Sequence, residues 1–139
     1  MHKYKILKDV ELVIQYYKDD ITLDDIKRLK INLINDIDFN SNFKLLIDIR
    51  KARYKLTVKE IEELVDFVSV KLKDKSLKRT AFLTSTPLQV AKTSIYILNK
   101  NIGSGHYKIF STIEAASHWL GIDLNKIDVV SSIINMKKI

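Results

Sequence analysis

The sequence has no cysteine, one proline and three glycines among its 139 residues. The lack of cysteine excludes disulfide bonds, a thiolate nucleophile and cysteine-based zinc or iron–sulfur sites. The scarcity of glycine and proline excludes collagen-like and low-complexity chains. No run reaches the ~18 consecutive apolar residues that a membrane-spanning helix needs, and the first eight residues lack the apolar stretch of a secretory signal. We therefore expect a cytoplasmic globular protein.

The charge balance is basic, with 24 lysines and arginines against 17 acidic residues and a net charge of +7. The densest basic run, residues 71–79, follows a predicted helix end, where cations complement the helix dipole. This run contains none of the aromatic residues on which single-stranded nucleic acids stack. The sequence also has no zinc-finger or GXXG motif. We therefore predict no specific nucleic-acid partner.

Short apolar segments alternate with amphipathic ones along the chain. The predicted strands cover residues 4–7, 11–17, 43–50, 80–84 and 107–110. The charged residues 18–20 are expected to end the second strand. Tyr16 and Tyr17 point to opposite faces of the sheet, so one of them is expected to be partly solvated.

Apolar residues between the strands recur at spacings of three and four, which predicts amphipathic helices. Four predicted helix starts carry a hydroxyl suited to N-capping: Thr22, Thr57, Thr86 and Ser111. Glu60 and Glu114 complete capping boxes with the second and the fourth of these. Pro87 suits the first position of the third helix, and Gly121 suits the end of the fourth. The expected buried faces are Ile26, Leu29, Leu33 and Ile37; Val58, Ile61, Leu64, Val65, Val68 and Leu72; and Leu88, Ala91, Ile95 and Leu98.

The elements follow the order β-β-α-β-α-β-α-β-α, with one further helix at the C-terminal end. Alternation of strands and helices predicts an α/β domain whose parallel strands are joined by right-handed crossovers. The first strand can join only as an antiparallel hairpin with the second. We therefore predict a single domain with a mixed, mostly parallel five-stranded sheet and helices packed on it.

Three segments after the N-terminal hairpin resemble one known group of proteins. They are residues 45–50 (LLIDIR), 81–87 (AFLTSTP) and 109–120 (IFSTIEAASHWL). The sequence is similar here to small bacterial proteins of the STAS/SpoIIAA-like family, which share a fold with anti-sigma-factor antagonists and, more loosely, with CRAL-TRIO lipid-transfer domains. The resemblance covers residues 1–121 and implies a non-catalytic interaction or regulatory module.

One motif of that family is missing. Anti-sigma-factor antagonists carry a phosphorylatable serine in an Asp-Ser-Ser-Gly-type turn after the third strand, and the matching stretch here, residues 52–58, reads ARYKLTV. Thr57 offers the only aliphatic hydroxyl, the kind that serine carries, in this stretch, and its capping box with Glu60 engages that hydroxyl. We therefore expect Thr57 to cap a helix rather than to act as a regulated phosphoacceptor.

Polar residues gather where the predicted parallel strands end, the edge at which open parallel sheets form their ligand sites. The candidate residues for binding an anion or another ligand are Asp48, Arg50, Thr84, Ser85 and Thr86, with Lys51 and Ser111 nearby. Hydroxyls and amides at a helix start beside a fixed cation suit an anion. In the alternative interpretation the same residues serve the structure, with Asp48 paired to Arg50 and the hydroxyls capping helices.

No catalytic or metal-binding constellation is recognisable. His2, His106 and His118 lack the spacing of metal ligands, and no nucleophile, base and acid can be grouped into a triad. Residues 103–105 contain two glycines but lack the strand, lysine and helix entry of a phosphate-binding loop. We predict no catalytic residue, no metal and no cofactor, and we expect Trp119 to pack in the core.

These observations predict a STAS-like interaction or regulatory module without catalysis, a monomer or weak homodimer whose main partner is an unknown protein. The alternative is a binder of a small apolar or anionic ligand, lipid-like or phosphate-containing, by analogy with CRAL-TRIO relatives. A deep apolar cavity between sheet and helices would favour the ligand class. A filled core with an exposed apolar patch would favour the partner class.

The last residues, 122–139, are predicted to be a helical extension beyond the domain of residues 1–121. Four apolar residues recur there at helical spacing: Leu124, Ile127, Val130 and Ile134. Because an isolated helix of this length is marginal in water, we expect the extension to dock on its own domain rather than on a second copy.

Overall fold

The computed structural model describes residues 2–71, 79–99, 106–123 and 125. The elements in chain order are β1 (His2–Leu7), β2 (Leu12–Ile21), α1 (Leu23–Ile34), β3 (Lys44–Tyr54), α2 (Val58–Lys71), β4 (Arg79–Leu83), α3 (Pro87–Ile97), β5 (His106–Phe110) and α4 (Ile113–Leu120). The predicted alternation of strands and helices is confirmed up to the end of α4. Among the described residues, no helix combines the length and the apolar character that crossing a membrane requires.

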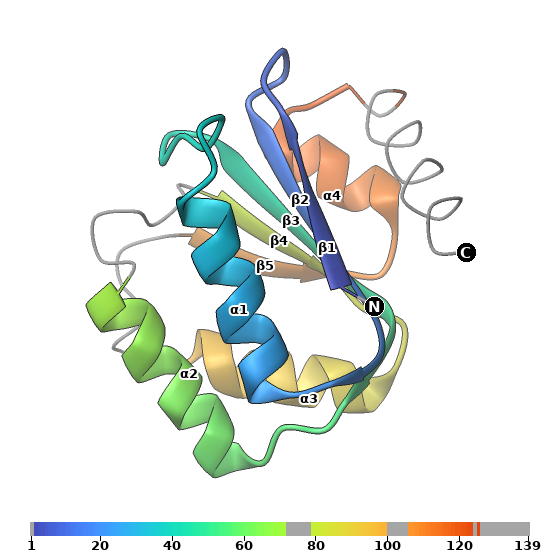
Figure 1. The fold of residues 1–139 in the computed structure, drawn as a ribbon. Helices are drawn as coiled ribbons and strands as arrows, with labels where there is room; N and C mark the ends of the chain where they lie inside the picture. The colour runs from blue at the N-terminus through green and yellow to red at the C-terminus, as the bar shows by residue number, and fades with distance from the viewer. Residues whose placement is uncertain (1, 72–78, 100–105, 124, 126–139) are drawn as a thin grey trace.

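The strands form one sheet in the order β1-β2-β3-β4-β5. β1 pairs antiparallel with β2, and the other neighbours pair in parallel. Each parallel crossover moves one strand further in the same direction, so right-handed connections place α1, α2 and α3 on one face. α4 follows the last strand and covers the opposite face (Figure 1). The predicted mixed, mostly parallel α/β fold is therefore confirmed.

Each face of the sheet has its own apolar core. Tyr17 and Ile47 belong to the cluster under α1, α2 and α3. Tyr16 and Leu46 belong to the cluster under α4, against which Trp119 packs as expected. The two tyrosines do point to opposite faces, yet each is only 2% exposed. The expectation that one of them is partly solvated is wrong, because the packing on both faces excludes water there.

The helix ends follow the predicted capping residues in most cases. Thr22 caps α1 and forms a capping box with Asp25. The Glu60 N–H donates to Thr57 Oγ1 at 3.1 Å, and the Thr57 N–H donates to Glu60 Oε1 at 2.9 Å. Gly121 ends α4 with a left-handed φ of 68°, a conformation that glycine adopts without a Cβ clash. These signals are local in sequence, so the sequence predicts them well.

The start of α4 differs from the prediction by one residue. Thr112 is the N-cap, and its side chain accepts the backbone N–H of Ala115. The predicted cap at Ser111 and its capping box with Glu114 are therefore wrong. Both positions carry a hydroxyl, so residue type alone does not decide between the two registers.

The second and third strands are longer than predicted. β2 continues through residues 18–20 to Ile21, and β3 continues beyond Arg50 to Tyr54. Asp19 has a positive φ of 64°, so the polar segment does disturb the strand. Pairing with β3 nevertheless resumes and reaches Ile21 opposite Tyr54. Long-range pairing here overrides the low strand preference of the charged residues.

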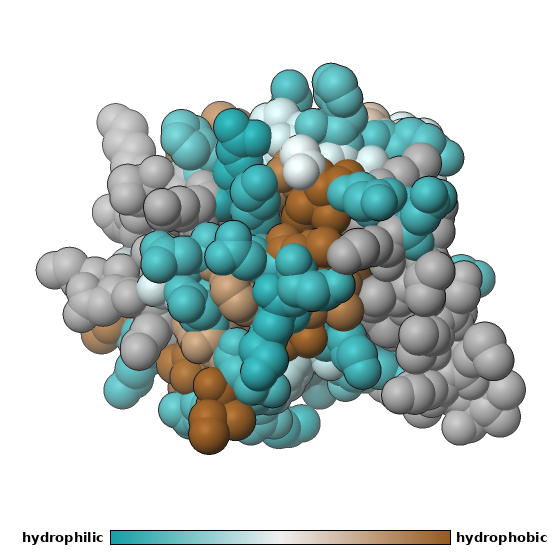
Figure 2. Space-filling model, turned by 90° about the horizontal axis from the view of Figure 1, so that it is seen from above, coloured by the Kyte–Doolittle hydropathy of each residue, from teal (hydrophilic) through white to brown (hydrophobic). Residues whose placement is uncertain are grey.

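α1 ends at Ile34, so the expectation that Ile37 extends its apolar face is wrong. The Asp36 carboxylate accepts the backbone N–H of Asp38 at 2.9 Å and the Tyr4 hydroxyl at 2.8 Å, which holds the chain in a turn. Ile37 is 97% exposed in the segment between α1 and β3. Figure 2 looks onto the end of the molecule that carries this segment and the β1–β2 turn, where apolar residues gather between hydrophilic ones.

α3 turns a different face to the sheet from the one predicted. Its buried residues are Gln89, Thr93 and Tyr96. The predicted apolar face, Leu88, Ala91, Ile95 and Leu98, is exposed instead. The reason is a set of hydrogen bonds from α3 side chains to backbone carbonyls of residues 50–56. These bonds fix the rotation of the helix against the hydrophobic preference of its sequence.

α2 buries four of its predicted residues: Ile61, Leu64, Val65 and Val68. Val58, in its first turn, is exposed instead. Leu72, the loop over 101–105 and nearly all of the predicted helix over 125–136 lie outside the described residues. The division into a domain of residues 1–121 and an extension of residues 122–139 therefore stays a prediction.

Candidate functional site

The candidate site lies at the carboxyl ends of β3 and β4, where β3 has a bulge. Residues 16–18 of β2 face residues 48–51 of β3, so two steps along one strand match three along the other. Such an extra residue disrupts the ladder locally and redirects the groups beside it. The Arg50 carbonyl at the bulge accepts a hydrogen bond from Ser85 Oγ at 2.7 Å, which ties β3 to the end of β4.

Asp48 and Arg50 form a two-point ion pair at this bulge. Arg50 Nε donates to Asp48 Oδ1 at 3.0 Å, and Nη2 donates to Oδ2 at 2.8 Å. The same carboxylate accepts the Arg50 backbone N–H at 3.1 Å. The hydrogen bond to Asp48 raises the pKa of the Arg50 guanidinium above its usual value. The pair carries no net charge, so the fixed cation expected at this edge is neutralised from within the protein.

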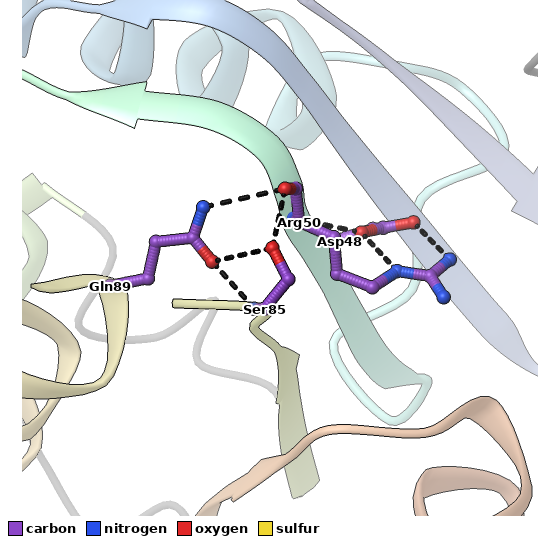
Figure 3. A network of polar contacts seen from close by, with 4 residues as sticks. All are labelled: Asp48, Arg50, Ser85 and Gln89. Carbon is purple, nitrogen blue, oxygen red and sulfur yellow. Dashed lines mark hydrogen bonds and ion pairs between the residues drawn. The ribbon is translucent and has the colours of Figure 1, made fainter. Parts of the chain in front are cut away.

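Gln89 connects this part of β3 to the start of α3 (Figure 3). Its Nε2 donates to the Ala52 carbonyl at 2.9 Å and to the Arg50 carbonyl at 3.4 Å. Its Oε1 accepts the Ser85 backbone N–H at 2.7 Å. Gln89 is 3% exposed, so its amide is a buried group whose donor and acceptor are both satisfied. It anchors α3 on the sheet.

The other candidate residues either make contacts within the protein or lie exposed on its surface. Thr86 Oγ1 caps α3 by accepting the Gln89 backbone N–H at 3.2 Å. Thr84 is buried, and its backbone N–H donates to the Phe110 carbonyl at 3.0 Å. Lys51 and Ser111 are exposed. The structure thus brings Asp48, Arg50 and Ser85 together. The Asp48–Arg50 pair and the Thr86 cap are contacts that the structural interpretation expects, whereas Ser85 Oγ donates to a carbonyl instead of capping a helix. Anion binding at this edge stays a prediction.

Gln89 and Lys30 are two of the buried polar residues that the sequence patterns above do not single out. Thr86 and Gln89 have the spacing of a capping box, and this spacing could have indicated that the Gln89 side chain makes hydrogen bonds at the start of the helix. Lys30 stands four residues after Ile26 and three before Leu33, on the apolar face of α1, and is 9% exposed. A lysine at such a position is the signal for a buried cation.

The histidines are not assembled into a site. His2 Nε2 lies 3.3 Å from Asp25 Oδ2, and burial lowers the pKa of His2 below its usual value despite that partner. His106 and His118 are exposed. Within the described ranges, no group of three or more histidine, cysteine or acidic residues is arranged to hold a metal ion.

Thr57 permits a direct test of its capping role. We expect Thr57→Ala to lower the free energy of unfolding by roughly 0.5–2 kcal/mol, because the Glu60 N–H loses its acceptor. Thr57→Asp should unfold close to the wild type, since aspartate also caps well. Urea denaturation followed by circular dichroism measures both. A Thr57→Ala protein of unchanged stability with altered partner binding would instead support a regulatory hydroxyl.

No protein-family model matches this chain, and no curated protein matches its sequence. Among solved structures, the chain is similar to an uncharacterised protein from the DUF3478 family with a SpoIIAA-like fold, from Shewanella loihica PV-4. The similarity covers 86% of this chain and 95% of that chain, with a TM-score of 0.56 and 20% sequence identity. The expectation drawn from residues 45–50, 81–87 and 109–120 is confirmed at the level of the fold. This chain has a SpoIIAA-like fold.

Proposed function

We propose that the protein is a non-catalytic interaction module of the cytoplasm that docks another protein on the outer face of α3. The observation that carries this proposal is the exposed apolar stripe of α3, in which Leu88 is 57%, Ile95 38% and Leu98 80% exposed. A surface helix ordinarily turns its apolar stripe inward and its polar residues outward. Clustered apolar exposure of this kind marks interaction sites in soluble proteins.

The outer face of α3 also lacks charge. Lys92 is the one charged residue of the helix, and its Nζ reaches back to the Tyr54 carbonyl at 3.2 Å and to the Leu56 carbonyl. Its charge is therefore directed at the protein's own backbone. The cores of protein interfaces are depleted in charged residues, so a helix face of exposed apolar residues without a charge supports a protein interface.

The basic residues near α3 support one choice of partner chemistry. Lys51 and Lys55 are exposed on the segment of residues 50–56 that α3 holds, and the whole chain carries +7. Two copies of such a chain repel each other, whereas acidic groups are attracted to it. The partner we propose is therefore a different protein with an apolar surface bordered by carboxylates.

The test combines cross-linking with a measured affinity. A photo-reactive amino acid at position 98 should give one discrete adduct in cells, identified by mass spectrometry, and the same amino acid at position 37 should not. The identified protein is then purified and titrated with this chain. The double variant Leu88→Asp, Ile95→Glu should weaken binding at least about ten-fold, equivalent to ~1.4 kcal/mol. Ile37→Asp is the control, because Ile37 is an exposed apolar residue of the segment between α1 and β3, a segment that lies at the other end of the molecule from α3 (Figure 1).

Two results would contradict the proposal. If Ile37→Asp weakened binding as much as the α3 variant, the α3 face would not be the docking surface. If sedimentation of the purified chain showed a dimer that the α3 variant dissociates, the face would be occupied by a second copy rather than by an acidic partner.

A further inference from the structure

A small cavity lies between the sheet and the helices α1, α2 and α3. Its volume is about 30 Å³, and its walls are mostly isoleucine, leucine and phenylalanine side chains. Its polar lining consists of Lys30 from α1 and three tyrosines, Tyr17 from β2, Tyr54 from β3 and Tyr96 from α3. One lysine and three tyrosines thus line an otherwise apolar cavity that is partly open to solvent.

Lys30 is the unusual member of this lining. It is 9% exposed, and its ammonium has no hydrogen bond or ion pair with any residue in the part of the chain that the structure describes. Burial lowers its pKa from 10.5 to about 8. A charge removed from water is costly unless a partner of opposite charge or a set of acceptors compensates it. Within the described part of the chain no group supplies this compensation, which leaves it to water in the cavity or to an anion bound there.

We propose that this cavity is a binding site for a small carboxylate of formate or acetate size, held by the Lys30 ammonium. One water-sized group needs roughly 10–15 Å³, so a cavity of about 30 Å³ holds two or three such groups, which matches the three heavy atoms of a carboxylate group. A carboxylate oxygen accepts from an ammonium in a strong charge-assisted hydrogen bond. The apolar walls suit a hydrogen or methyl substituent and do not suit a second negative charge.

The tyrosines can add a hydrogen bond to the carboxylate, and because they are neutral they do not form an ion pair with Lys30. A phenol hydroxyl donates one hydrogen bond, and the Tyr17 hydroxyl is directed to Gln15 Oε1 at 3.3 Å. The Tyr54 hydroxyl has Thr93 as a neighbouring partner, so Tyr96 is the phenol we expect to donate to a carboxylate. Burial raises the pKa of Tyr54 to about 12 and raises those of Tyr17 and Tyr96 as well. The phenols therefore stay neutral when Lys30 is charged, and α2 contributes only Leu64 to the lining.

The test uses the full chain with ¹³C-labelled lysine and sodium acetate as the probe, at pH 6.5 and constant ionic strength maintained with sodium chloride. We expect acetate to shift the Lys30 Cε signal saturably and to leave that of Lys27, one turn away on α1, unchanged. Affinity should fall as the pH rises through about 8, because the neutral amine no longer attracts the anion. The pKa of Lys30 should be higher in acetate than in chloride alone. Formate should also bind, and pivalate should be too bulky.

Variants separate this site from general salt effects. Lys30→Met replaces the lysine by an unbranched apolar side chain one atom shorter and should reduce acetate affinity at least about ten-fold, the effect of ~1.4 kcal/mol. Lys27→Met removes a neighbouring charge and should leave affinity unchanged. The proposal fails if chloride alone reproduces the acetate shifts, if pivalate binds equally well, or if Lys30→Met still binds. It also fails if acetate does not move the pKa of Lys30 in the wild-type chain, a result that does not depend on any variant folding.

Discussion

Replacing Lys30 by methionine is expected to stabilise the protein at pH 7 by roughly 3 kcal/mol. The pKa of Lys30 is 10.5 in an ordinary environment and about 8 in the folded protein, and each pKa unit corresponds to ~1.4 kcal/mol of unfavourable charge burial. Methionine fills a similar volume with an apolar chain, so it removes this cost without opening a large void. Urea unfolding at pH 7, in a buffer free of carboxylates, measures the difference.

Because its pKa is lower in the folded protein, Lys30 makes the free energy of unfolding rise with pH, whereas alkali usually lowers it. Between pH 8 and about 10.5 the unfolded chain holds a proton on Lys30 that the folded protein has released. The free energy of unfolding of the wild type should therefore rise over this interval. Below pH 8, Lys30 is charged in the folded protein and the full cost of burying that charge is present. Above about pH 10 the buried tyrosines oppose the rise, because they ionise in the unfolded chain before they do in the fold.

Comparison with two variants isolates Lys30 from these other groups. The advantage of Lys30→Met should shrink steadily from pH 8 to pH 10.5, because the tyrosines are common to both proteins. Lys27→Met changes a partly exposed lysine that lies 5.5 Å from the Phe67 ring, and its effect should stay within about 0.5 kcal/mol. A Lys30→Met protein no more stable than the Lys27→Met protein at pH 7 would show that the Lys30 ammonium is solvated.

The sequence predicts the fold well because its strongest signals are local. The apolar run of residues 43–50 predicts a strand covered on both faces, and it forms the centre of the sheet. Thr22 and Thr57 cap helices through partners only three residues away. Signals of this kind depend on neighbouring residues alone, so they survive in the folded structure.

The rotation of α3 illustrates what local signals cannot predict. Hydrophobic spacing favours burial of Leu88, Ile95 and Leu98, but Gln89 and Lys92 hold the helix by hydrogen bonds to carbonyls of residues 50–56. The first of these carbonyls lies at the β3 bulge, where the pairing register of β2 and β3 shifts by one residue. Pairing between distant segments thus decides which face of a third segment is exposed.

The candidate site shows the same division. The rule that polar groups gather at the carboxyl ends of parallel strands selects Asp48, Arg50 and Ser85, and the structure does bring them together. The sequence does not show that their hydrogen bonds are made within the protein. Nor does it single out Lys30, because an isolated lysine on an apolar helix face becomes informative only when sheet and helices enclose it.

Gln89→Leu is expected to destabilise the protein by roughly 2–4 kcal/mol. The substitution keeps the size of the side chain but leaves the Ala52 carbonyl without the donor at 2.9 Å and the Ser85 N–H without the acceptor at 2.7 Å. Each buried group that loses its partner costs ~1–3 kcal/mol. Val90→Ala, an exposed neighbour on the same helix, should change stability by less than about 0.5 kcal/mol. Both are measured by urea denaturation at pH 7.

Gln89→Glu separates the two halves of this interaction. Glutamate keeps an acceptor for the Ser85 N–H but, when ionised, cannot donate to the Ala52 carbonyl and places a charge in a buried site. We expect it to destabilise the protein at pH 7 and to recover, relative to wild type, as the pH falls and the carboxyl is protonated. Burial favours the neutral acid, so this recovery should begin above the ordinary glutamate pKa of about 4.3. If Gln89→Leu were as stable as Val90→Ala, hydrogen bonding would not be what orients α3, and its exposed apolar stripe would need a different cause.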